Sequence, residues 1–179
     1  MELAVQQNLA PGETLAEKLV SVPVRGPLRA DFTTREELSV YAVALNLLGQ
    51  AAAERDLQIV IEPLIRYETH LINTLADAAV AAEQANHPSI KILVDFFHMN
   101  VEEADIAASI REHGDAIGHV HLADSNRLNP GRGHLDFVPG LRALADTDYD
   151  GVMALECRIE GDPMAELRYT AEFVRSLLE

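Results

Sequence analysis

A regular alternation of strand-length apolar runs with helical segments constrains the fold of this chain most strongly. Six-residue runs rich in β-branched and aliphatic side chains occur four times, a length that suits a buried strand. Apolar strands that alternate with helices form parallel sheets covered by those helices. The pattern therefore predicts an α/β protein with strands at 57–62, 90–95, 117–122 and 151–156.

Helical periodicity fills the intervals between these runs. From Leu38 to Ala52, apolar residues recur at spacings of three and four, and Thr33 or Thr34 can cap this helix. We predict two further helices at 70–86 and 101–113. A last helix has Asp162 as N-cap and Pro163 at its first position.

The N-terminal third shows a weaker pattern. Residues 3–8 and the segment "VSVPVRGP" are candidate strands, and "PGETLAEKL" is a candidate helix. Because the sequence contains no linker, low-complexity tract or internal repeat, we expect a single domain over residues 1–179.

Charge and cysteine content exclude several functional classes. With 14 basic and 29 acidic residues, the formal net charge of −15 repels phosphate backbones and anionic membranes. We therefore expect neither a nucleic acid nor a membrane as a partner. The only cysteine, Cys157, cannot form an internal disulfide and fits a reducing compartment. Since no secretory signal and no membrane-spanning apolar run is found, a cytoplasmic protein is the expectation.

A potential metal ligand stands at the C-terminal end of each of the four strands: Glu62, Asp95, His121 and Glu156. One acid in such a place is more often a solvated strand end than a ligand. Four in succession favour a site, because the C-terminal strand ends of a (β/α) barrel converge on one face. Three carboxylates there would repel one another unless a divalent cation neutralised them. Three oxygens and one nitrogen favour Mn²⁺, Mg²⁺ or Co²⁺ over a structural zinc.

Three more polar residues follow the same strand ends. Glu68 lies six residues after Glu62, His98 three after Asp95, and Arg127 six after His121. These offsets place all three in the loops above the predicted cluster.

Four segments resemble a known family: "VIEPLIRYETHLINT", "ILVDFFHMNVEE", "HVHLADSNRLNPGRGHLDF" and "ALECRI". They are similar to the sugar isomerase/epimerase family of xylose-isomerase-like TIM barrels, and most similar to its D-tagatose 3-epimerase/D-psicose (allulose) 3-epimerase group. The resemblance runs from about Thr34 to the C-terminus, and the ligand spacings of 33, 26 and 35 residues fit that group.

The resemblance implies a role for each candidate residue. Glu62, Asp95, His121 and Glu156 would hold one divalent metal, usually Mn²⁺. The two glutamates would also act as the acid/base pair. The resemblance further implies that the sugar substrate is bound by Glu68, His98 and Arg127.

The implied activity is that of a metal-dependent ketose 3-epimerase, which abstracts a proton next to the carbonyl and forms an enediolate. A related aldose–ketose or hydroxypyruvate-type isomerase is an alternative, because returning the proton to the adjacent carbon gives an isomerisation. A non-catalytic remnant that keeps the metal ligands is another. An AP-endonuclease-like nuclease is disfavoured, because it needs more histidine ligands and a basic surface.

The length of the chain predicts an incomplete barrel. A complete barrel of this type needs about 250 residues, whereas this chain has 179. The ligand-bearing strands match the last four of eight. We therefore expect a TIM-barrel-like fold of about six strands, with the last four strand–helix units intact and roughly two N-terminal units, near the second and third, missing. Unpaired strand edges would favour a homo-oligomer, a dimer or tetramer.

Overall fold

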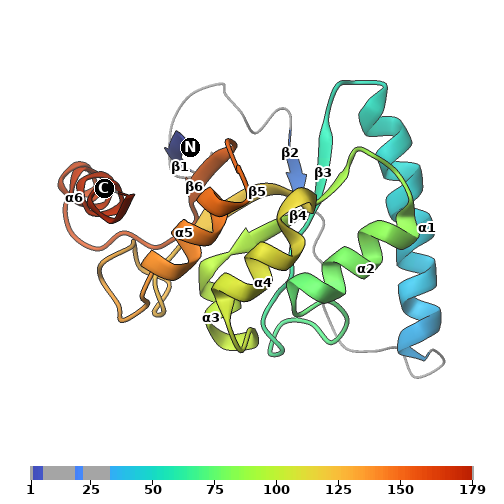
Figure 1. Cartoon of the computed structure of the whole chain (residues 1–179), viewed down its shortest axis with the longest axis horizontal. Coiled ribbons are helices and arrows are strands. Elements are labelled where there is room, and N and C mark those ends of the chain that lie inside the picture. Colours follow the sequence, from blue (N-terminus) through green and yellow to red (C-terminus); the bar gives the residue numbers. More distant parts are fainter. Residues whose placement is uncertain (1, 6–18, 22–32, 179) are drawn as a thin grey trace.

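A computed structural model of the chain describes residues 2–5, 19–21 and 33–178 (Figure 1). Its described strands form one fully parallel sheet in the order β1-β6-β5-β4-β3-β2. The strands are β1 (Glu2–Val5), β2 (Leu19–Ser21), β3 (Gln58–Ile61), β4 (Ile90–Asp95), β5 (Ile117–Leu122) and β6 (Val152–Leu155). This topology confirms the prediction of a six-stranded, partial (β/α) barrel.

Helices follow β2 to β6 and lie side by side, from α1 at one end of the view to α6 at the other (Figure 1). Each of β3, β4, β5 and β6 is followed by at least one helix, so the last four strand–helix units are intact. The helices are α1 (Thr34–Ala53), α2 (Leu75–Ala85), α3 (Phe96–Glu102), α4 (Ile106–His113), α5 (Val138–Asp146) and α6 (Pro163–Leu178). No described helix is both long and apolar enough to cross a membrane.

Helix caps explain where the helices depart from the sequence prediction. The single helix predicted at 101–113 is wrong, because Asp95 caps α3 and Asp105 caps α4. The helix predicted at 70–86 begins at Leu75, since Thr74 and Asp77 form a capping box there. The candidate strand at 3–8 is observed as Glu2–Val5, and "PGETLAEKL" lies outside the described residues.

The strands separate two buried layers by simple alternation. On the face under the helices, aliphatic residues form the main core together with the helices. They are Ile59, Ile61, Ile92, Val94, Val120, Leu122, Met153 and Leu155. The opposite face carries Val60, Leu93, His119 and Ala154, and two residues further along each strand it carries a candidate ligand. The same alternation that builds the core therefore directs all four candidate ligands to the inner face.

A bulge in β5 sets the register between the candidate ligands Asp95 and His121. Ile117 pairs with Ile92, but His119 pairs with Leu93, so Gly118 is one extra residue on β5. A Cβ at Gly118 would lie 2.7 Å from the Cβ of Lys91, closer than packed atoms allow. Beyond the bulge the pairing continues until His121 stands opposite Asp95.

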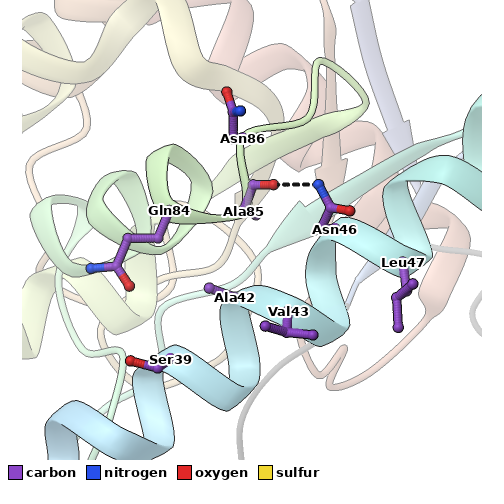
Figure 2. A pocket seen from close by; sticks show the side chains of 8 residues that line it. All are labelled: Ser39, Ala42, Val43, Asn46, Leu47, Gln84, Ala85 and Asn86. Atoms are coloured by element: carbon purple, nitrogen blue, oxygen red, sulfur yellow. Dashed lines mark hydrogen bonds between the residues drawn. The ribbon is translucent and has the colours of Figure 1, made fainter.

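Helices α1 and α2 enclose a shallow groove on the outer surface (Figure 2). Asn46 bridges its walls by donating a hydrogen bond from Nδ2 to the carbonyl oxygen of Ala85 at 2.7 Å. Val43 and Leu47 project from α1 with exposed side chains. Of the predicted α1 stripe, Leu45 and Ala52 are buried, but Leu48 is 43% exposed.

Replacing the bulge glycine tests this register. We expect Gly118→Ala to destabilise the fold by about 1–3 kcal/mol, because the backbone-attached Cβ of Lys91 cannot move aside. For a domain of this size, this change lowers the melting temperature by roughly 2–10 °C in calorimetry. The comparison variant is Gly49→Ala in α1, where the new methyl would lie 2.7 Å from the ring and 3.1 Å from the Cβ of His87, a partly exposed side chain that can turn aside. Equal melting temperatures for both variants would contradict the role given to Gly118.

Candidate metal and active site

The four candidate ligands meet in one cluster on the inner face of the sheet. Glu62, Asp95, His121 and Glu156 each offer one ligand atom, and these atoms lie within 4.8 Å of one another. Glu62, Asp95 and His121 are buried, whereas Glu156 is partly exposed. The cluster therefore opens toward solvent on the Glu156 side.

His121 directs a ring nitrogen at all three carboxylates. Its Nδ1 atom lies 3.0 Å from Glu156, 3.4 Å from Glu62 and 3.6 Å from Asp95. It is buried and makes no well-directed hydrogen bond. Burial alone would lower the pKa of His121, but the three carboxylates raise it to about 11. Without a metal, a proton on His121 thus partly neutralises the cluster.

Asp95 has a second, structural role as the N-cap of α3. Its Oδ1 atom accepts hydrogen bonds from the backbone N–H groups of Phe97 and His98, at 2.9 and 3.1 Å. Burial would raise the pKa of Asp95, but His121 and Arg127 outweigh it and the pKa is lowered. His121 and Arg127 therefore hold this carboxylate ionised, and the backbone N–H groups at the start of α3 fix its orientation.

Arg127 reaches from the β5–α5 loop across two of the carboxylates. Its Nη1 atom donates to both oxygens of Asp95 at 2.9 Å, and its Nη2 atom donates to Glu156. The guanidinium also lies over the ring of Phe97, 4.7 Å from the centroid. Burial would lower the pKa of Arg127, but Asp95 and Glu156 raise it, so the side chain is a permanent cation.

His98 is buried at the first turn of α3. Its Nδ1 atom accepts a hydrogen bond from the backbone N–H of Ile65 at 3.3 Å. The neutral ring therefore carries its proton on Nε2, which leaves a donor at that position.

The β3–α2 loop carries Glu68, which is partly buried. Two contacts pin this loop to the end of α3: Arg66 forms a bidentate ion pair with Glu102, and Glu103 accepts from the backbone N–H of Leu75. The structure thus places Glu68 in a tethered loop next to the strand end that carries Glu62.

The chemistry of this donor set fits a divalent cation. Three carboxylates carry three negative charges, while Arg127 and a divalent cation together carry three positive charges. A buried imidazole nitrogen without a directed partner supplies the fourth donor. Hard oxygen donors with one imidazole suit Mn²⁺, Mg²⁺ or Co²⁺.

Comparison with known proteins agrees with this architecture. The family model described as xylose isomerase-like TIM barrel matches residues 10–177. The chain belongs to this family. Membership confirms the resemblance predicted from the four sequence segments.

The family relatives include sugar epimerases. A 3-dehydro-D-guloside 4-epimerase of Escherichia coli K12 is 38% identical over 134 residues, which cover 74% of this chain and 51% of the relative. A D-psicose 3-epimerase of Enterocloster bolteae is 39% identical over 112 residues, which cover 63% of this chain and 37% of the relative. The crystal structure of an apo 3-keto-D-glucoside 4-epimerase from E. coli has a TM-score of 0.82 at 33% identity. The match covers 89% of this chain and 64% of the epimerase chain. The chain spans roughly half the length of these relatives.

Several residues that shape the site have no sequence prediction. Asp124 organises the loop that carries Arg127, Phe97 supports the guanidinium, and Arg66 with Glu102 tethers the loop of Glu68. For Asp124 a signal existed, because "DSN" followed by two glycines is typical of a turn held by its own side chain.

Cation binding should stabilise the folded chain. At about 100 times its dissociation constant, Mn²⁺ should add about 2.7 kcal/mol of stability, or roughly 5–10 °C in melting temperature. His121→Ala should lose most of this gain, because it removes the single nitrogen donor of the cluster. His113→Ala, at the end of α4, is the matched control and should keep it. An equal Mn²⁺-dependent shift in both variants would exclude His121 as a ligand.

Proposed function

We propose that this chain is a metal-dependent sugar epimerase, and that its substrate class is ketoses, with inversion at the carbon next to the carbonyl. The observation that carries the proposal is the cluster of three carboxylates and one imidazole at four consecutive strand ends. The epimerase names of relatives at 38% and 39% identity support the same chemistry. We propose Mn²⁺ as the resident ion, with Mg²⁺ or Co²⁺ as substitutes.

The reaction requires removal of a weakly acidic hydrogen beside a ketone. When bound, a divalent cation supplies Lewis-acid stabilisation of negative charge on the substrate oxygens. Glu62 and Glu156 are the proposed proton-transfer groups: one carboxylate accepts the proton, and the other returns one to the opposite side of the carbon. Inversion of the stereocentre follows.

The neighbouring polar groups bind and orient the sugar in this proposal. Arg127 adds a fixed positive charge next to Glu156, where it can stabilise the enediolate. His98 offers its Nε2 donor, because Ile65 occupies Nδ1. Glu68 is the proposed acceptor for sugar hydroxyl groups.

An aldose–ketose isomerase is the second candidate, because the same two carboxylates could return the proton to the adjacent carbon. Product analysis separates the two reactions, since an epimerase yields a second ketose and an isomerase an aldose. A remnant that binds metal without catalysis would give neither product.

Deuterium incorporation tests the proposed chemistry directly. We expect the Mn²⁺-loaded protein in D₂O to place deuterium next to the carbonyl of D-fructose, D-psicose, D-tagatose or L-ribulose, as followed by NMR. Glu156→Gln should reduce this exchange by about 10²–10⁴-fold, because it removes a proton-transfer group. Glu160→Gln, an exposed residue in the same β6–α6 connection, should exchange normally. Normal exchange by metal-loaded Glu156→Gln would contradict the acid/base assignment.

We also propose that the chain acts as one domain and associates with a second copy of itself. Among the described strands, β1 and β2 each have only one neighbour, so each has an edge that can accept a further strand. Size-exclusion chromatography with light scattering should therefore give a mass of about twice the 19.6 kDa chain or more. A monomer at micromolar concentration would refute the association.

A further inference from the structure

The β5–α5 loop, residues 123–137, is organised around a buried carboxylate that the proposed reaction does not use. Asp124 is 1% exposed. Its Oδ1 atom accepts from the backbone N–H groups of Ser125 and Leu135, at 2.7 and 3.1 Å, and its Oδ2 atom accepts from that of Gly131 at 2.9 Å. Burial would raise the pKa of Asp124, but these backbone donors lower it, so the group is ionised. One side chain therefore ties together the start, middle and end of the loop.

Arg127 stands in a conformation that needs such support. Its φ of 62° lies in the left-handed region, which costs a residue with a Cβ roughly 1–2 kcal/mol. Its N–H donates to the carbonyl of Asp124 at 2.8 Å, and its carbonyl accepts from the N–H of Arg158 at 2.8 Å. The backbone N–H of Asp124 donates to the carbonyl of Leu128, also at 2.8 Å. The turn that holds Arg127 is thus closed on Asp124.

The middle of the loop is attached to α6. Arg132 forms a bidentate ion pair with Glu166 and lies over the ring of Tyr169. Asn129 donates to Thr170 at 2.6 Å. Asp124 connects this anchored middle to the turn, because its carboxylate accepts from Gly131 while its backbone carbonyl accepts from Arg127.

Gly133 shows how tightly the carboxylate is enclosed. A Cβ at this position would lie 2.1 Å from Oδ1 of Asp124 and 2.6 Å from Oγ of Ser125. Any larger residue at 133 must therefore displace Asp124 or open the loop. This gives a second way to disturb the same contact without changing a charge.

We propose that Asp124 is a positioning residue that acts through Arg127 on the metal site. By fixing the turn, it holds the guanidinium against Asp95 and Glu156, where the guanidinium competes with a divalent cation for these two carboxylates. This role rests on the proposed metal site, and it makes Asp124 one of the residues that set the affinity of that site for a divalent cation. Loosening the loop should therefore strengthen cation binding, the opposite of what general damage to the site would do.

Titration calorimetry of Mn²⁺ into the full chain tests whether loosening the loop raises or lowers the affinity for the cation. Arg127→Ala removes a positive charge in contact with two ligands, and Coulomb's law predicts a gain in affinity on the order of tenfold. Asp124→Asn should give a gain of at least about threefold by releasing Arg127, even though losing the Asp124 charge acts in the other direction. Gly133→Ala should shift the affinity the same way and keeps the proposal testable if Asp124→Asn does not fold.

The double variant separates positioning from a merely structural role. If Asp124 acts through Arg127, Asp124→Asn should change the Mn²⁺ affinity by less than about twofold in an Arg127→Ala background. Asp136→Asn, an exposed residue of the same loop that loses the same charge, should match wild type. Circular dichroism confirms that each variant is folded.

If wild type binds Mn²⁺, two results would overturn the role of Asp124 and leave the proposed metal site standing. One is an Asp124→Asn effect that is undiminished in the Arg127→Ala background. The other is unchanged or weaker binding by folded Asp124→Asn and Gly133→Ala. No Mn²⁺ binding by wild type would overturn the proposed metal site and this inference with it.

Discussion

Mutual repulsion among three carboxylates at neighbouring strand ends is the constraint on which the rest of the site depends. Glu62, Asp95 and Glu156 are brought within 4.8 Å of one another and of His121, and such a group is stable only with positive charge inside it. The chain supplies one permanent cation, Arg127, and one titratable ring, His121. Backbone N–H groups at the start of α3 stabilise Asp95 further. With His121 neutral as a ligand, two negative charges remain beside Arg127, and a divalent cation would neutralise them.

Much of the surrounding fold positions these charged side chains relative to one another. Strand alternation separates the ligand face from the aliphatic layer under the helices, and the bulge at Gly118 aligns His121 with Asp95. All four candidate ligands lie on β3 to β6 or directly after these strands, so the cluster is assembled from four consecutive strand–helix units. The four members of the candidate cluster therefore lie within a chain that spans roughly half the length of its relatives.

The strands and the ligand positions could be predicted from the sequence because both produce local, repeated patterns. Apolar runs located β3 to β6 within one or two residues, and a polar residue at each end identified the cluster members. The division of residues 96–113 into α3 and α4 could not be predicted, because Asp95 is both a candidate ligand and a cap. The role of Glu102 depends on hydrogen bonds to a distant segment, which leave no periodic signal, whereas the only sequence signal for Asp124 is the local turn that follows it. Helix α5 has no counterpart among the predicted ranges, since Pro139 and Gly140 near its start obscure the helical pattern.

Anomalous diffraction from crystals grown with Mn²⁺ locates the bound cation relative to the four candidate ligands. We expect one strong anomalous peak within about 2.5 Å of a donor atom from each of Glu62, Asp95, His121 and Glu156. A peak elsewhere, or an ordered cluster without anomalous density at saturating Mn²⁺, would contradict this expectation.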